Sequence, residues 1–143
     1  MAVTLREAQL DDRPVLGRLL ADYLFEFDGR TERYPYFDAY WEEPERLPLL
    51  IEADGEIVGL CLIRRQAEGW SIAEFSVTPA RRLGGVGAAA VEELATRARS
   101  EGATYLEAKV HPDSHGALPF WLAAGFTETE RTDGGAAVTR RPL

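Results

Sequence analysis

Three glycines, Gly84, Gly85 and Gly87, stand between an apolar run and a stretch whose apolar residues recur at helical spacing. Glycine lets a backbone approach a ligand closely, and the free N–H groups at the start of a helix attract anions. Arg81 and Arg82 add positive charge at the mouth of this loop. The segment therefore predicts an anion site suited to phosphate or pyrophosphate.

The glycine spacing excludes two common phosphate-binding loops. No Lys-Ser or Lys-Thr pair follows the glycines, as a Walker A loop requires. The run Gly85-Val86-Gly87 lacks the third glycine of a dinucleotide fingerprint, and it lies in mid-chain. A tight turn that needs glycine only for its geometry stays open as the structural alternative.

The loop "RLGGVG" resembles the Gln/Arg-x-x-Gly-x-Gly/Ala signature of the GNAT superfamily of acetyltransferases, with Arg82, Gly85 and Gly87 at the signature positions. The resemblance covers almost the whole chain. The stretch "FEFDGR…YPYFDAYWEEPERLPLLI" also resembles a group of small predicted acetyltransferases. A second stretch, "SHGALPFWLAAGF", is similar to the family's Asn-x-x-Ala-x-x-Phe-Tyr-x-x-x-Gly-Phe segment at Ala117, Phe120, Gly125 and Phe126.

The resemblance implies that acetyl-CoA is the co-substrate. Strand Ser71–Val77 would splay from strand Tyr105–Val110, and the pantetheine arm would bond to it in the gap as an added strand does. Amides of the glycine loop would hold the pyrophosphate. The residues that the resemblance assigns to acetyl-CoA are Phe75, Ser76, Val77, Arg82, Leu83, Gly84, Gly85, Val86, Gly87, Ala88, Ser114, Phe120 and Trp121.

The sequence departs from the family pattern at two positions. Ser114 replaces the usual Asn, and Trp121 replaces a Tyr that protonates the departing thiolate in many members. An indole N–H donates hydrogen bonds but cannot act as a general acid. We expect Trp121 to pack beside the thioester. A thiol with a pKa of about 8.5 leaves readily enough that a water, or no acid at all, would suffice.

Transfer to an amine needs a base, because an ammonium is not a nucleophile. Glu74 is the first candidate, since related acetyltransferases often place an acidic residue on this strand and "SIAEFSV" is otherwise apolar. Alternation along the strand puts Glu74 on one face with Ile72 and Ser76, opposite Phe75 and Val77.

Other assignments stay open for the base. Glu74 could instead lie on a solvated face or pair with Arg64 or Arg65. Glu107, on the neighbouring strand, is the second candidate. Two histidines titrate in the right range but lie in a proline-containing loop, His111 and His115.

The family places the acceptor against the first helix, the second short helix and the loop between them. The sequence does not decide between a peptide N-terminus, a polyamine, an antibiotic amine and a small metabolite. The alternative functions are a non-catalytic acyl-CoA sensor and an unrelated α/β nucleotide-binding protein. Candidate substrate-binding residues are Tyr23, Phe27, Tyr34 and Tyr36, followed by Tyr40 and Trp41, with Glu26, Asp28 and Asp38 available for a cation.

These residues need a mixed sheet to position them. An Asp54-Gly55 pair between apolar runs predicts a hairpin, and a strand-helix-strand unit follows that hairpin. The expected fold is α/β (α+β): a GNAT fold in one domain, residues 1–143, with about six or seven strands and helices on both faces. Expected elements are strand Val3–Ala8, a helix from Asp12 to Gly29, a short helix within Arg33–Pro48, strands around Asp54 and after Gly69, helices ending at Gly102 and Gly125, strand Thr104–Val110 and two strands around Gly134.

Composition limits the class of protein. The chain has 143 residues, 45% hydrophobic and 28% charged, which is typical of a globular protein and not of a disordered or membrane protein. Its net charge of -8 argues against nucleic acid and favours cationic partners such as amines. A single cysteine and a start without a signal peptide predict a cytoplasmic protein. We expect no metal and no membrane association, and a homodimer stays open.

Overall fold

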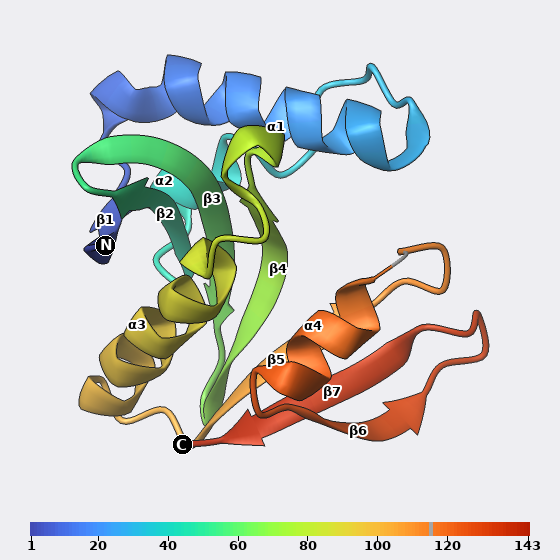
Figure 1. The fold of residues 1–143 in the computed structure, drawn as a ribbon. Coiled ribbons are helices and arrows are strands. Elements are labelled where there is room, and N and C mark those ends of the chain that lie inside the picture. The colour runs from blue at the N-terminus through green and yellow to red at the C-terminus, as the bar shows by residue number, and fades with distance from the viewer. Residues whose placement is uncertain (115) are drawn as a thin grey trace.

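Among the described residues, seven strands form one mixed sheet in the order β1-β2-β3-β4-β5-β7-β6, with helices on both faces (Figure 1). This computed structural model describes residues 1–114 and 116–143. The α/β class, the mixed sheet and the helices on both faces are thus confirmed. Within the described ranges, none of the helices is long and apolar enough to cross a membrane.

The elements follow one another in the predicted order, with two 3-10 turns besides. The helices are α1 (Arg13–Asp28), α2 (Ala39–Glu42), α3 (Val86–Ser100) and α4 (Ala117–Ala123), and the 3-10 turns are Leu10–Asp12 and Pro79–Arg81. The strands are β1 (Val3–Glu7), β2 (Arg46–Ala53), β3 (Glu56–Arg65), β4 (Gly69–Val77), β5 (Tyr105–Val110), β6 (Thr127–Arg131) and β7 (Ala137–Pro142).

Helix α1 covers one face of the sheet. Its buried stripe of Leu16, Leu20 and Leu24 follows the four-residue spacing of a helix face. The helix ends at Gly29, whose φ of 74° is the left-handed conformation that glycine adopts readily. Together with α2, this helix covers Leu50, Leu60 and Leu62.

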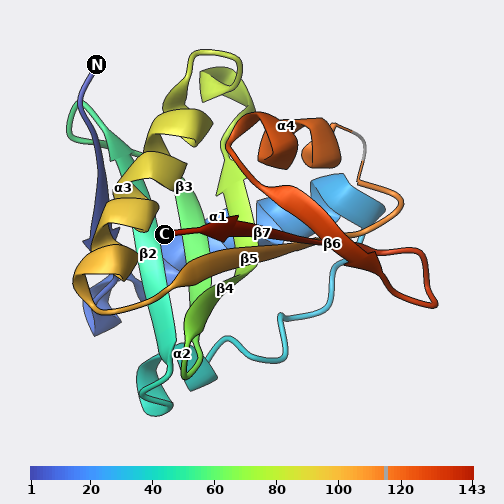
Figure 2. The same cartoon turned by 90° about the horizontal axis from the view of Figure 1, so that it is seen from below.

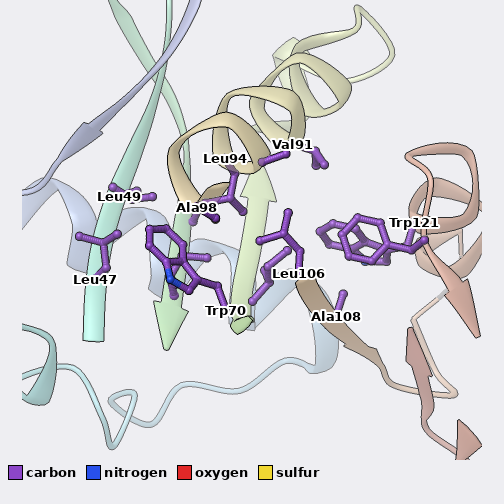
Figure 3. Packing of buried hydrophobic residues seen from close by; sticks show 14 of the residues in the cluster. Leu47, Leu49, Trp70, Val91, Leu94, Ala98, Leu106, Ala108 and Trp121 are labelled. Atoms are coloured by element: carbon purple, nitrogen blue, oxygen red, sulfur yellow. The ribbon is translucent and has the colours of Figure 1, made fainter. Parts of the chain in front are cut away.

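Helices α3 and α4 cover the opposite face. Figure 2 shows α3 in front of the sheet and α1 behind it. Val91, Leu94 and Ala98 of α3 pack on Trp70 and Leu106 of the central strands (Figure 3). Burying such side chains drives folding by about 1.5–3 kcal/mol each.

Strands β4 and β5 diverge half-way along β4. They pair in parallel only from Gly69 to Ile72 of β4, although both strands continue. Figure 1 shows them diverging from a common start. On its other edge β4 stays paired with β3 as far as Val77. The segment from Glu74 to Val77 therefore has one free backbone edge, as the predicted splay requires.

A β-bulge lies at the point where β4 diverges from β5. Leu62 pairs with Glu74 and Ile63 with Ile72, so Ala73 is an extra residue on β4. A bulge of this kind bends its strand and ends regular pairing.

The bulge also corrects one prediction. Regular alternation put Glu74 on the same face as Ile72, but the extra residue reverses that relation. Ile72 packs under α3, whereas Glu74 lies opposite Leu62, which packs under α1. The predicted pairing of Glu74 with Ser76 on one face is kept, because both follow the bulge.

Gly59 tests how tightly β3 and β4 are packed. A Cβ at this position would lie 2.2 Å from the Ser76 carbonyl oxygen and 3.1 Å from Val77 Cα. We expect Gly59→Ala to lower the free energy of unfolding by about 1–3 kcal/mol, the usual range for overpacking. Urea unfolding measures the change. The control is Gly17→Ala in α1, where the nearest ring atom is 3.5 Å away and the helix should gain stability. Equal effects of both substitutions would contradict the packing described.

Candidate active site

The glycine loop presents a row of free amides. After the 3-10 turn, Leu83 and Gly85 adopt positive φ angles of 65° and 86°, and Gly85 caps α3. Ala89 N–H donates to Gly85 O at 3.0 Å. In the described part of the chain, the amides before it, from Leu83 to Ala88, have no backbone acceptor. Such a set of amides at a helix start can bind a phosphate or pyrophosphate.

The side chains of the loop leave that space to the backbone. Val86 is buried in the core, so only its amide can face a ligand. The Leu83 side chain is fully exposed. Gly87 is required by packing, because a Cβ there would lie 3.0 Å from the Phe120 ring and 3.8 Å from the Phe75 ring.

The loop arginines are bound to other elements. Arg82 Nε donates to the Val77 carbonyl oxygen at 2.8 Å, and its Nη2 lies 2.7 Å from Glu26 Oε1 of α1. Arg81 Nη1 lies 3.3 Å from Glu56 Oε2. The side chain of Arg82 therefore connects the loop to α1, and the loop amides are the groups left to bind an anion.

Aromatic side chains line the free part of β4 on the α4 side. Trp121 is 7% exposed, and its ring centroid lies 5.3 Å from Phe75 and 5.0 Å from both Phe120 and Phe126. These distances are typical of edge-to-face packing. The indole thus packs among aromatic rings, and its predicted place beside the thioester stays a prediction. Ser114 makes the turn before α4, where its carbonyl accepts from Ala117 N–H at 3.3 Å.

Glu74 occupies the other side of the same segment. Its carboxyl group is half-buried under α1, and among the described residues it forms no direct ion pair. Burial raises the pKa of Glu74 to about 7, while the charge of Arg30 and a hydrogen bond from the Tyr23 hydroxyl act in the opposite direction. A carboxyl group with this pKa can take up a proton at neutral pH. The alternative ion pair with Arg65 is excluded, since Arg65 bonds to the Pro44 carbonyl and lies 3.5 Å from Glu101.

Glu107, the second candidate, is engaged elsewhere. Its Oε2 accepts from Arg140 Nε at 2.8 Å, and that guanidinium lies 4.2 Å from the centre of the Tyr105 ring. A carboxylate held in this way serves the pairing of β5 with β7. Of the two candidates, Glu107 is held in an ion pair and Glu74 is in none among the described residues; the role of either as base stays a prediction.

Of the two histidines, His111 lies among the described residues. His111 is exposed, its Nδ1 accepts from Asp113 N–H at 3.1 Å, and its ring packs edge-on against Phe27 at 5.5 Å. His115 lies outside the described residues. His111 thus closes the gap between the end of α1 and the end of β5.

The predicted acceptor residues fall into two groups. Tyr23 and Phe27 of α1 lie over the gap, close to Glu74 and His111 respectively. Tyr34 is half-buried beside Tyr40, whereas Tyr36 is exposed and packs edge-to-face on Tyr34 with ring centroids 5.8 Å apart. The structure thus places Tyr36 at the exposed surface, away from that gap, and the acceptor-binding role of all four residues stays a prediction.

Two cavities flank α1. One of about 210 Å³ lies between α1 and the ends of β3 and β4, and one of about 270 Å³ lies between α1 and the following loop. Tyr23 and Ser76 line the first, and Tyr34 lines the second. The first cavity joins α1 to strands that are distant along the chain, whereas the second lies between neighbouring segments within residues 17–37.

Sequence reasoning missed Arg30. Its charge acts on Glu74, and its Nη2 donates to Asp28 Oδ2 at 2.7 Å. The only available signal was its place just after Gly29, where the chain leaves α1. No group of three or more His, Cys, Asp or Glu residues in the described ranges could hold a metal ion.

Comparison with known proteins defines the class. Residues 13–126 match the model of the acetyltransferase (GNAT) family, so the chain belongs to that family and is an acyltransferase. No curated protein matches the chain.

Solved structures share the fold at low sequence identity. PaiA N-acetyltransferase from Thermoplasma acidophilum, solved with coenzyme A, has a TM-score of 0.80 at 15% identity, with 100% of each chain covered. The ribosomal-protein-S18-alanine N-acetyltransferase of Escherichia coli has a TM-score of 0.78 at 16% identity, covering 99% of this chain and 94% of its own. Ard1 from Thermoplasma volcanium has a TM-score of 0.77 at 23% identity, covering 100% and 99%.

The free amides of the loop predict a binding phenotype. Gly85→Glu should place a carboxylate where the anion binds and strain a residue with φ of 86°. Acetyl-CoA should raise the Tm of the wild type but not of this variant. The matched control is Gly55→Glu, which has φ of 83° and open space around it. It should carry the same backbone strain and keep the shift. A full shift in a folded Gly85→Glu variant would show that the anion binds elsewhere.

The raised pKa of Glu74 predicts a pH-dependent stability. The unperturbed carboxyl has a pKa of 4.5, and the folded value is about 7. Ionisation therefore costs free energy only in the folded chain, and stability is lost as pH rises from about 4.5 to 7. Glu74→Gln should be more stable than the wild type at pH 8, and the difference should vanish near pH 4.

Urea unfolding at several pH values measures this difference. Glu93→Gln, an exposed position on α3, controls for the loss of one charge. A difference that does not change with pH would show that Glu74 ionises as freely in the folded chain as in the unfolded one.

Proposed function

We propose that the protein is an N-acetyltransferase that moves the acetyl group of acetyl-CoA to an amine of a small molecule or peptide. The observation that carries this proposal is the position of Glu74. It is a half-buried carboxyl group with a pKa of about 7 on the one segment of β4 that has a free edge.

The described residues fit acetyl-CoA. The amides from Leu83 to Ala88 suit the pyrophosphate, and the free edge from Glu74 to Val77 suits the amide groups of pantetheine. Acetyl-CoA supplies an acetyl group on a thiol that leaves readily. A side chain at position 87 would clash with the Phe120 ring, so the backbone at the start of α3 stays bare at this position.

Side chains of this protein would then activate the amine and line the site. Glu74 removes a proton from the amine nitrogen, so that the nitrogen can attack the acetyl carbonyl. A carboxylate there also attracts the cationic amine, in keeping with the net charge of -8. Tyr23 and Phe27 line the acceptor side, and Trp121 lines the opposite side.

The names of the structural neighbours support an amine acceptor. The Escherichia coli protein acts on an alanine of ribosomal protein S18, and PaiA is an N-acetyltransferase. At identities of 15% and 16%, these likenesses show the fold alone. The acceptor class is therefore tested with one peptide that begins with alanine, one polyamine (spermidine) and one arylalkylamine (tyramine).

We expect acetyl-CoA to release free thiol with at least one of these amines. Glu74→Gln keeps the shape but removes the base, so kcat should fall by about 10²–10⁴-fold. Acetyl-CoA affinity should stay unchanged. The wild-type rate should fall as pH drops through about 7, and the variant should lose that dependence.

The matched control is Glu107→Gln, because Glu107 is also on the central strands but is bound to Arg140. It should keep most of the activity. If the acidic limb persisted in Glu74→Gln, the base would be another residue. Acetyl-CoA binding without thiol release for any amine would favour the non-catalytic sensor.

A further inference from the structure

The first half of the loop between β4 and α3 has few contacts of its own. The Arg82 N–H donates to the Pro79 carbonyl oxygen at 3.3 Å, and the Ala89 N–H donates to that of Gly85 at 3.0 Å. In the described part of the chain, no backbone amide between Arg82 and Ala89 has a backbone acceptor. The Leu83 side chain is fully exposed, and two glycines follow it. Neither side-chain packing nor backbone hydrogen bonds therefore fix the start of this loop.

Leu83 makes that lack of support costly. Its φ of 65° lies in the left-handed region, which a residue with a Cβ adopts only at a cost in free energy. Such a conformation persists where the surrounding contacts hold it. The side chain of the preceding residue, Arg82, makes contacts of this kind.

The Arg82 guanidinium connects the loop to two other elements. Its Nε donates to the carbonyl oxygen of Val77 at the end of β4 at 2.8 Å, and its Nη2 lies 2.7 Å from Glu26 Oε1 of α1. Arg82 and Glu26 also line the 210 Å³ cavity together with Pro79. Figure 1 shows the 3-10 turn that begins at Pro79 beside α1. The hydrogen bond fixes Arg82 relative to its own strand, and the ion pair fixes it relative to α1.

We propose that Glu26 is a positioning residue for acetyl-CoA binding and that it acts through Arg82 on the amides that follow. This inference rests on the proposed function, because acetyl-CoA is the anion assigned to the loop. The sequence made Glu26 available for a cationic acceptor, whereas in the structure its partner is Arg82. With Arg82 held, the start of the loop is ordered before the pyrophosphate arrives, so less conformational entropy is lost on binding.

The charge of Glu26 gives the proposal a distinctive sign. A carboxylate near an anion site repels the anion, so its removal should tighten binding on electrostatic grounds alone. Loss of a positioning contact should weaken binding instead. The accessible fractions of the Arg82 and Glu26 side chains are 40% and 47%, so the ion pair contributes little to the stability of the fold. Affinity for the co-substrate is therefore the property to measure.

The test measures the Kd of coenzyme A by isothermal titration calorimetry, which needs neither an acceptor nor turnover. Glu26→Gln keeps the shape of the side chain and removes its charge. We expect the Kd of this variant to rise about threefold to tenfold, through the lost ion pair and the strained loop conformation that it helps to hold. Thermal unfolding without ligand checks that the variant folds as the wild type does.

The matched control is Asp22→Asn. Asp22 lines the same cavity one turn earlier on α1, and among the described residues it forms no ion pair. This variant loses the same charge without touching Arg82. It should bind coenzyme A as tightly as the wild type or slightly more tightly.

A double-mutant cycle shows whether Glu26 acts through Arg82. Arg82→Gln should also raise the Kd, and adding Glu26→Gln to that variant should change the Kd less than about twofold. In turnover with the amine that the wild type acetylates fastest, Glu26→Gln should raise the KM for acetyl-CoA more than it lowers kcat.

The sign of the effect and its dependence on Arg82 decide the outcome. Weaker binding in Glu26→Gln that disappears in the Arg82→Gln background supports the positioning role. Unchanged or tighter binding overturns it, and so does an equal loss in Asp22→Asn or a loss that persists without Arg82. If the wild type binds coenzyme A but acetylates no amine, the proposed function fails, and calorimetry still decides the role of Glu26. A wild type that binds no coenzyme A defeats both.

Discussion

The bulge at Ala73 is the constraint on which the candidate site depends. It ends the pairing of β4 with β5 at Ile72, and it turns the next residue to the α1 face. One inserted residue thus creates both the free backbone edge and the half-buried carboxyl beside it. Without the bulge, Glu74 would point toward the apolar cluster under α3, where an ionised carboxyl is very costly.

The free segment of β4 has an apolar side, which faces α4, and a polar side, which faces α1. On the α4 side, Phe75 packs against Phe120 and Trp121. These side chains have no group that can give up or take up a proton in water. On the α1 side lies the carboxyl group of Glu74, whose pKa is lowered by Arg30 and Tyr23 against the effect of burial. A strand that is apolar on one face and polar on the other, with one edge open, can hold a substrate by its backbone. It can then carry out proton transfer from a single direction.

Local signals predicted the elements well. The Asp54-Gly55 turn has φ angles of 53° and 83°, which only a few residue types adopt readily, and the glycines before α3 have an equally local cause. The bulge at Ala73 could not be predicted from the sequence, because alternating and bulged strands have the same composition. Contacts between distant segments were also invisible: Arg140 holds Glu107 across 33 positions. The first base candidate therefore came from family position, while its environment came only from the fold.

The basicity of Glu74 is a balance set largely by α1. Burial alone pushes its pKa upward, and Tyr23 and Arg30 hold it near 7. Arg30 is fixed in turn by Asp28, which accepts from both its backbone N–H and its guanidinium just past the end of the helix. The way in which the chain leaves α1 at Gly29 therefore sets the charge next to the base. The loop that follows also lines a cavity, so one segment of the chain shapes that cavity and sets the charge that acts on Glu74.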